Sequence, residues 1–541
     1  MTTLLLTPMI LIPFLGALLQ VLSPRPARGI AIAAGALSSV LGLMVLSRGW
    51  MGVPDALVER LPWVGSYAIS YEMAVDGISR IAVLIVSLLF PLLIASEWTR
   101  ERGARGLHAL LLVLQGSLLG AVCAQDLFLL FFFWAISSVP VFFLVGIWGG
   151  PRREEAAFRT LVTSAFGSAL LFGAIILVYH AKEPHTFLLR DLVEGGIPAR
   201  ILSLSGIELS SSLVAFILIS VSFALRAPIW PLHGWFARLV DEAPPAVTVA
   251  VAGALVPCAI QIYLRLTHLL FPELSADWAD AILAIGLVNL VVGALVALSR
   301  RRLSSLLSSL MLGQVGISLI AIGSRNPTAM AGMAHYQLAS AVAIAALVLL
   351  LGFLGARGLT DRLSGANSSG GALALSAPFA GAVMALALAA WVGAPGLGGF
   401  VGESLVFMGA FSRSAWILVP ILAAILLLAV RLSGIYREIF LGGEGAVGEA
   451  GPEGMEVVGR ERAILIPLVA LMLVFGLYPK PLLDLIRPAA SHLLAGEIPA
   501  FAPPMADESA PVPAPQNESP ENTQEKAPEK APEKAPEKEA P

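Results

Sequence analysis

Long runs of apolar residues fill the chain from its start to about residue 495. A helix needs about 20 mostly apolar residues to cross a bilayer, and fourteen such segments can be recognised. They are apolar around the whole helix, which predicts a bundle of spans, an all-α polytopic membrane protein. The predicted spans are 4–22, 29–47, 78–96, 106–124, 126–148, 160–180, 210–236, 244–265, 279–299, 305–323, 329–354, 373–411, 415–438 and 463–479.

Two predicted spans are too long and contain residues that interrupt helices. The seventh contains Pro228 and Pro231, and the twelfth contains Pro395 and Gly396. Proline removes a helical hydrogen bond, so breaks at membrane depth are tolerated where they line a cavity. Spans four to eight (about 106–265) and nine to thirteen (about 279–438) both carry the break in their fourth member. This spacing predicts two inverted five-helix repeats with broken helices 7 and 12; two unrelated proline kinks are the alternative.

Composition excludes most soluble classes. The chain is 57% apolar and 13% charged, against about 45–50% and about 25% in soluble domains. Its two cysteines, Cys123 and Cys258, lie inside predicted spans and are expected to be inert. No disulfide scaffold or metal site is expected, and a net charge of −3 excludes a polybasic nucleic-acid binder.

Basic residues predict the orientation of the chain. Loops after odd-numbered spans hold 17 arginines, and the other loops hold 8 basic residues. The first set should be cytoplasmic, which places both termini outside the cytoplasm of a bacterial-type inner (plasma) membrane. We expect two spans and a loop in residues 1–60, an antiporter-like core in 61–495, and a disordered tail rich in Pro, Ala, Glu and Lys in 496–541.

Ionisable residues inside spans are costly to bury and are usually functional. The polar and ionisable candidates are Arg226, His233, His335, Tyr336, Glu403 and Arg431. No lysine lies in the interior of a predicted span. A buried lysine can carry a proton reversibly, whereas the guanidinium of arginine stays charged. Arg226 is therefore expected to be a fixed charge or a donor to carbonyls freed at Pro228, compensated by Asp241, Glu242 or a neighbouring subunit.

Seven motifs in order resemble the antiporter-like membrane subunits of respiratory complex I, of the subunit M or chain 4 type. The resemblance covers roughly residues 60–490. The motifs are Asp76-Gly77-Ile78-Ser79, Phe133-Trp134-Ala135, and the segments 143–150, 224–235, 242–244, 396–403 and 476–484.

The resemblance implies a subunit of a proton-translocating NADH:quinone oxidoreductase. Flavin, iron–sulfur clusters and quinone would then be held by partner subunits, with no cofactor in this chain, and its partners would be other membrane-arm subunits. Two isolated cysteines cannot ligate a cluster, and no glycine-rich nucleotide loop stands between a strand and a helix.

Family members carry protons along a central axis of Glu, Lys and His residues, and most of these positions differ here. The family Glu of the fifth span falls on Ala135. Family lysines fall on Arg226, Pro257 and Ser304, and family histidines on Gln314 and Tyr336, the latter beside His335. Glu403 alone matches a titrating family position, and His233 matches the family His beside the first break.

Four hypotheses follow. The chain is a membrane-arm subunit that holds its neighbours together and pumps weakly or not at all. Alternatively, it pumps protons by an altered route through Glu403, His335, Tyr336, Gln314 and water. A third possibility is a subunit of a multi-subunit cation/proton antiporter, a membrane-bound hydrogenase or an inorganic-carbon uptake complex. The fourth is an unrelated secondary transporter.

Overall fold

The computed structural model describes residues 4–23, 28–50, 58–77, 79–100, 103–198, 200–204, 207–300, 302–358, 373–441 and 454–497. These residues are mostly helical. The predicted tail lies outside the described residues from residue 498 onward.

The first two helices are followed by a β-hairpin, which hydropathy did not predict. The elements are α1 (Leu6–Leu22), α2 (Arg28–Trp50), β1 (Val58–Val64), the short 3-10 helix η1 (Gly65–Tyr67) and β2 (Ile69–Ala74), with β1 and β2 antiparallel. Glu59 in β1 accepts hydrogen bonds of 2.5–2.8 Å from the first backbone N–H groups of α1. A carboxylate stabilises the positive N-terminal end of a helix. The hairpin therefore anchors α1, and the predicted boundary at residue 60 falls inside β1.

The first half of the core covers six of the predicted spans and contains a second hairpin. Its elements are α3 (Ser79–Ser96), α4 (Ala104–Cys123), α5 (Leu127–Ile136), α6 (Ser138–Trp148), α7 (Arg153–Ala181), α8 (Leu189–Glu194), β3 (Ile201–Leu204), β4 (Ile207–Ser210), α9 (Ser211–Arg226), α10 (Gly234–Glu242), α11 (Pro245–Val249), the π-helical turn η2 (Ala250–Leu255) and α12 (Val256–Leu270). Strands β3 and β4 are antiparallel.

The second half continues with α13 (Pro272–Asp277), α14 (Ala279–Ser299), α15 (Leu303–Ser324), α16 (Pro327–Gly355), α17 (Leu373–Ser376), α18 (Pro378–Trp391), α19 (Gly398–Arg413), the 3-10 turn η4 (Ala415–Ile417), α20 (Leu418–Phe440), α21 (Gly459–Leu477) and α22 (Lys480–Leu494). Helices α21 and α22 meet at a bend of 67°. The last predicted span ends at residue 479, so α22 is a helix that hydropathy does not predict.

Proline interrupts two spans that were predicted to be continuous. The fifth is divided into α5 and α6 at Ser137, because Pro140 lacks the N–H that would bind the carbonyl of Ile136. The eighth contains η2 just before Pro257, which likewise lacks the N–H for an upstream carbonyl. Both departures free polar backbone groups inside the bundle.

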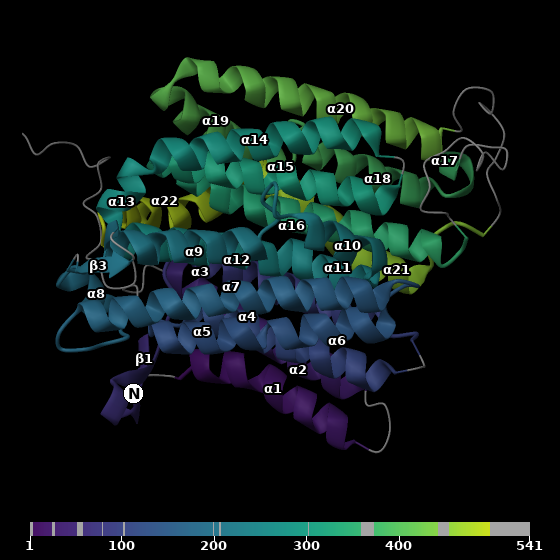
Figure 1. The fold of residues 1–541 in the computed structure, drawn as a ribbon. Helices are drawn as coiled ribbons and strands as arrows, with labels where there is room; N and C mark the ends of the chain where they lie inside the picture. The colour runs from purple at the N-terminus through teal and green to yellow at the C-terminus, as the bar shows by residue number, and fades with distance from the viewer. Residues whose placement is uncertain are drawn as a thin grey trace, which may run out of the picture. The chain divides into compact units, whose positions relative to one another are not determined.

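The polytopic helical architecture is confirmed. Among the described residues, ten spans of helix are individually long and apolar enough to cross a membrane, and the bent pair α21–α22 would add an eleventh. The count of fourteen stays a prediction because α1, α9 and α18 are shorter apolar helices. Hairpin strands β1 and β3 and helices α8 and α13 lie at one end of the bundle, and α17 lies at the other (Figure 1).

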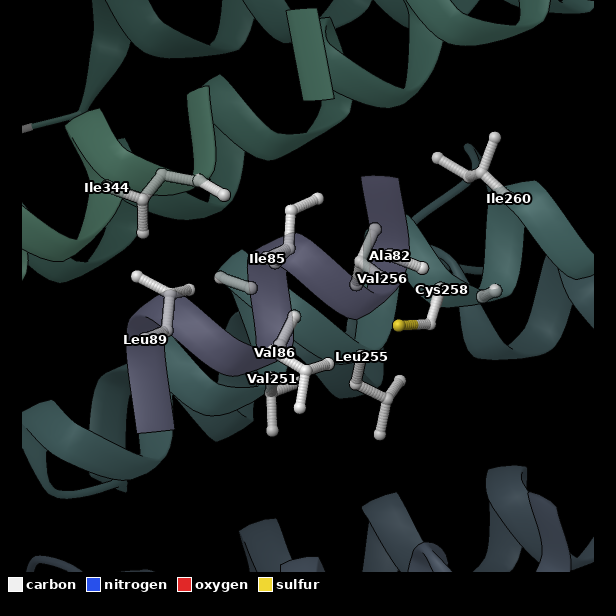
Figure 2. Close-up of a cluster of buried hydrophobic side chains, with 14 of the residues drawn as sticks. Ala82, Ile85, Val86, Leu89, Val251, Leu255, Val256, Cys258, Ile260 and Ile344 are labelled. Atoms are coloured by element: carbon white, nitrogen blue, oxygen red, sulfur yellow. The ribbon is translucent and has the colours of Figure 1, made fainter. Parts of the chain in front are cut away.

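Apolar contacts between helices far apart in sequence form the core. Ile85 and Leu89 of α3 lie beside Val251 of η2 and Ile344 of α16 (Figure 2). These side chains are buried. The turn η2 is thus enclosed by protein, as irregular backbone in a membrane must be.

Helices α14 and α15 pack at very short range through glycine. A Cβ added at Gly286 would lie 2.7 Å from the backbone nitrogen of Ile320, which a side chain cannot do without displacing the helix. Small residues let membrane helices approach closely. This contact places α14 beside the break between α9 and α10.

Candidate functional site

Arg226 is the last residue of α9 and is 1% exposed. The helix stops there because Pro228 restricts Ala227 to an extended conformation (φ −98°, ψ 144°). The guanidinium donates hydrogen bonds from Nη1 to Ser138 Oγ (2.5 Å) and from Nη2 to Ser137 Oγ (2.6 Å). A longer bond joins Nη2 to the Trp134 carbonyl (3.3 Å), and Cζ lies 4.3 Å from the centroid of the Trp134 ring.

The break between α5 and α6 supplies these acceptors. Trp134 is in the last turn of α5, where carbonyls carry the partial negative charge of the helix dipole. Ser137 and Ser138 stand at the junction, and Ser137 also donates to the Trp134 carbonyl (2.6 Å). Two hydroxyls, a helix C-terminus and an indole face thus surround a fixed positive charge. Ala135, at the position of the family Glu, contributes no carboxylate.

Neither of the two acidic residues expected to compensate Arg226 does so, which leaves compensation by a neighbouring subunit as a prediction. Asp241 accepts hydrogen bonds from Ser304 (2.7 Å) and Ser305 (3.4 Å) at the start of α15. Glu242 accepts a bond from the backbone of Arg152 (2.9 Å) and pairs with its guanidinium at 3.5 Å. Both carboxylates are therefore engaged at the end of the bundle where α10 meets α7 and α15.

A residue that the sequence reading missed fills the first break. Asn289 of α14 is fully buried and accepts a hydrogen bond from the Trp230 backbone N–H (2.7 Å). Its amide nitrogen donates to the carbonyls of Pro228 (3.3 Å) and Leu312 (2.8 Å). Asn289 satisfies the backbone where the span is interrupted. A lone asparagine in an otherwise apolar run was the available signal.

His233 and Pro231 occupy the remainder of this break. His233 precedes α10 and is half-buried, with no hydrogen-bond partner for its Nδ1 among the described atoms. The break therefore contains the imidazole of His233 beside Pro231. The guanidinium of Arg226 points away from it, toward α5 and α6.

The second break separates α18 from α19. Gly393 (φ +70°) and Gly396 (φ +89°) adopt the left-handed conformation that favours glycine, on either side of Pro395. Glu403, in the second turn of α19, is 5% exposed and lies near Tyr336 of α16, which is also buried. A Cβ at Gly402 would lie 2.6 Å from Tyr336 Cβ, so the absence of a side chain there brings α19 against α16.

His335 precedes Tyr336 on α16 and contacts a different helix. Its Nε2 lies 3.2 Å from the carbonyl of Phe475 in α21, and its Nδ1 has no partner among the described atoms. The end of α21 also touches the second break, because a Cβ added at Gly398 would lie 3.0 Å from Phe475 Cβ. Glu403, Tyr336 and His335 therefore share one neighbourhood around α16, α19 and α21.

Neutral polar side chains lie on helices between the two breaks. Gln261 of α12 donates to Gln337 of α16 (2.9 Å), and Gln314 of α15 donates to Ser340 of α16 (2.7 Å). All four are buried. One amide atom each of Gln261, Gln337 and Gln314 lacks a partner among the described atoms. Pro257, at a family Lys position one turn before Gln261, adds no charge.

Arg431, also a candidate, lies apart from these groups. Its guanidinium donates to the carbonyl of Arg300 (2.7 Å) and pairs with Glu438 of the same helix at 3.4 Å. These contacts lie where α20 approaches the end of α14. The structure thus groups Arg226 with α5 and α6, Glu403 with α16, and Arg431 with neither.

Charged residues outside the spans fix the loops that hold these helices. Asp126 accepts bonds from the backbone N–H groups of Phe128, Leu129 and Ser70 (2.9–3.0 Å), which caps α5 and ties it to β2. Burial raises the pKa of the Asp126 carboxyl above its usual value. Among the residues that the structure describes, no group of three or more His, Cys, Asp or Glu side chains could hold a metal ion.

Comparison with known proteins identifies the family. The family described as NADH:quinone oxidoreductase/Mrp antiporter, TM, matches residues 124–428 of this chain. The chain belongs to this family. Chain 4 of a Synechococcus NAD(P)H-quinone oxidoreductase is 30% identical, over 88% of this chain and 90% of the relative. Subunit M of the NADH-quinone oxidoreductase of Escherichia coli is 29% identical, over 91% and 96% of the two chains.

Solved structures share the fold of this family member. A chain of respiratory complex I from Thermus thermophilus superposes with a TM-score of 0.81 at 23% identity, covering 91% of this chain and 99% of that one. A chain of the archaeal membrane-bound sulfane sulfur reductase gives 0.77 at 18% identity, covering 92% and 99%. A chain of the Mrp complex from Dietzia gives 0.74 at 22% identity, covering 90% and 52%. The chain is therefore a multi-pass membrane protein with the fold of the antiporter-like subunits.

Proposed function

We propose that this chain is a membrane-arm subunit of a complex I-like NADH:quinone oxidoreductase that supports its neighbours and pumps protons weakly or not at all. The surroundings of Arg226 carry the proposal. A guanidinium stays charged under all physiological conditions, and its described contacts are hydroxyls, a carbonyl and an indole ring. A fixed charge without a carboxylate partner repels a passing proton and cannot relay one.

The relatives support the choice of assembly. Two are named as subunit M or chain 4 of NADH- or NAD(P)H-quinone oxidoreductases and match this chain along most of its length. In this proposal flavin, iron–sulfur clusters and quinone belong to partner subunits. The chain has two cysteines, both buried and unpaired, and an iron–sulfur cluster needs more thiolate ligands than these at one site.

We place the subunit in a bacterial inner membrane with both termini on the non-cytoplasmic side. Arginine-rich loops support this orientation, because two of them meet at one end of the bundle: Arg28 at the start of α2 donates to the carbonyl of Arg100 after α3 (3.1 Å). Arg460, in the first turn of α21, donates a hydrogen bond to the Thr99 hydroxyl (3.3 Å) in the same region. Basic loops gather on the cytoplasmic side of membrane proteins. A cysteine introduced by Ala500→Cys should react with a membrane-impermeant maleimide from the non-cytoplasmic side of a vesicle, and reaction only from the cytoplasmic side would overturn this orientation.

A second candidate function is proton pumping by a route that uses Glu403. The position of Glu403 favours it, because a buried carboxyl group beside a glycine-rich break can bind and release a proton. In this alternative His335 and Gln314 would lie along the route. Membership of a cation/proton antiporter or another respiratory membrane complex remains a further candidate, supported by the fold shared with the Dietzia and archaeal chains.

The proton-to-electron ratio of the assembled complex distinguishes the two functions. We would reconstitute the complex carrying Glu403→Gln in vesicles, with Glu438→Gln as a matched control at the exposed end of α20. The proposal expects both variants to assemble and to keep the parent ratio. A ratio lowered by about one antiporter-like subunit's share in Glu403→Gln alone would refute it and support the Glu403 route.

Partners of the natural chain test the choice of assembly. Affinity purification from its own membrane in mild detergent, followed by mass spectrometry, should recover flavin- and iron–sulfur-bearing dehydrogenase subunits. Recovery of antiporter subunits without a dehydrogenase would transfer the chain to an antiporter complex. Recovery of hydrogenase or carbon-uptake subunits would likewise overturn the complex I proposal.

A further inference from the structure

A small cavity with both polar and apolar lining residues lies between the start of α3 and helices α4, α12 and α22. Its volume is about 10 Å³, and it is lined by Asp76, Ser79, Val122, Gln261, Ile262, Arg265 and Leu493. One water molecule needs a cavity of about 10–15 Å³ and two to four polar partners. The space is therefore of the size that admits a single water and excludes anything larger.

An ion pair at one side of this cavity is held too far apart for direct hydrogen bonding. Arg265 Nε lies 4.0 Å from Asp76 Oδ2, and the two side chains are 6% and 2% exposed. Other contacts fix both groups. Asp76 Oδ1 accepts bonds from the N–H (2.7 Å) and the hydroxyl (2.9 Å) of Ser79, while Arg265 donates to the carbonyls of Ala124 (3.0 Å) and Val122. A polar gap of this width is commonly bridged by water.

The other side of the cavity presents an amide atom without a partner. Gln261 is 3% exposed, and its Nε2 is taken by Gln337, so Oε1 is left without a hydrogen bond among the described atoms. Exchanging oxygen and nitrogen in both amides would still leave one polar atom of each unpaired. An unsatisfied buried polar group is costly, and a water in the cavity would remove that cost.

We propose that this cavity binds one water molecule that accepts a hydrogen bond from Arg265 Nε and donates to Asp76 Oδ2 and Gln261 Oε1. Three partners are the typical number for a buried water. The bond from Gln261 to Gln337 extends the link to α16. There the Ser340 hydroxyl donates to the backbone carbonyl of Gln337 (3.2 Å) and accepts from the Gln314 side chain. The water thus joins the Asp76–Arg265 ion pair, next to the end of β2, to the amide side chains of Gln261 and Gln337.

The link orients side chains and does not carry protons. An amide neither binds nor releases a proton near neutral pH, so a proton on the water has no acceptor at Gln261. Leu493 of α22 closes the cavity, and α22 packs tightly there because a Cβ at Gly77 would lie 2.9 Å from the Leu485 carbonyl. The inference is independent of the proposed function, because it holds in any assembly and whether or not Glu403 moves protons.

A structure of the assembled complex at a resolution that shows waters tests the inference. We expect one density peak within 3.2 Å of Arg265 Nε, Asp76 Oδ2 and Gln261 Oε1. Gln261→Leu should lose the peak, whereas Gln115→Leu, a buried glutamine of α4 outside this link, should keep it. An empty cavity in the parent, direct contact between Asp76 Oδ2 and Arg265 Nε, or a peak that survives in Gln261→Leu would each overturn the proposal. The parent density decides the matter even if Gln261→Leu does not assemble.

Discussion

Replacing Ser138 by alanine is expected to lower the free energy of unfolding by about 2 kcal/mol. The Ser138 hydroxyl accepts a 2.5 Å bond from a guanidinium that is 1% exposed. A hydrogen bond to a buried charged group contributes about 1.5–3 kcal/mol, and bulk water cannot reach Arg226 to replace it. The serine is 8% exposed, and the small space left by removing its oxygen should add little to this loss of stability.

Ser87 offers a matched control on α3. Its hydroxyl is buried to a similar degree, at 3% exposed, and has no hydrogen-bond partner among the described atoms. Ser87→Ala removes the same atom without breaking a bond to a charge, and because it removes an unpaired buried hydroxyl it should leave the free energy of unfolding unchanged or raise it. The predicted difference between the two alanine variants is then at least about 2 kcal/mol, more than a tenfold change in the unfolding equilibrium.

A double-mutant cycle assigns the difference to Arg226. We would titrate the purified chain in mixed micelles with SDS and follow unfolding by tryptophan fluorescence. In an Arg226→Met background, Ser138→Ala should cost less than about 0.5 kcal/mol, because the charged donor is gone. Equal costs for Ser138→Ala and Ser87→Ala, or an undiminished cost in the Arg226→Met background, would refute the idea that neutral oxygens stabilise this charge.

Three further predictions concern contacts that position the helices. Glu59→Gln should destabilise the chain by about 1 kcal/mol because α1 loses a carboxylate at its N-terminus; an unchanged SDS midpoint would contradict this. Asn289→Leu leaves the backbone at the first break unpaired, costing about 2–4 kcal/mol, and should speed amide exchange at Trp230. Gly402→Ala should cost about 1–3 kcal/mol by forcing α19 from α16, whereas Gly434→Ala, in a roomier part of α20, should not destabilise.

Hydropathy predicts the long helices because a membrane span is apolar on all sides. Such a span is visible in the sequence as one continuous run of apolar residues. Elements of mixed polarity were missed for the same reason. Helix α22 buries Ile486 on one face and carries polar residues on the other, and no window over it is apolar throughout. Hairpin β1–β2 has short strands whose pairing depends on residues up to 16 positions apart.

The candidate residues were predictable, but their partners were not. Arg226 and Glu403 stood out because ionisable residues are rare in spans, and the structure places each beside an interruption of its helix. Ser137, Ser138 and Asn289 come from other helices, and serine in a span is too common to mark a site. Only the packing of the helices shows that the serines accept hydrogen bonds from the Arg226 guanidinium and that Asn289 pairs the backbone groups at the first break.

Both halves of the chain bury an ionisable side chain beside an interrupted helix, but the two side chains differ in chemistry. At the first break the permanent cation of Arg226 is held by hydroxyls and by the negative end of α5, and none of these described contacts is a group that titrates near neutral pH. At the second, the buried carboxyl group of Glu403 lies close to left-handed glycines, and a carboxyl can exchange its proton. The side chains between them, Gln261, Gln337 and Gln314, are neutral amides. Proton transfer between the halves would therefore have to bypass those amides through water, which makes Glu403 the residue at which any remaining pumping activity has to be sought.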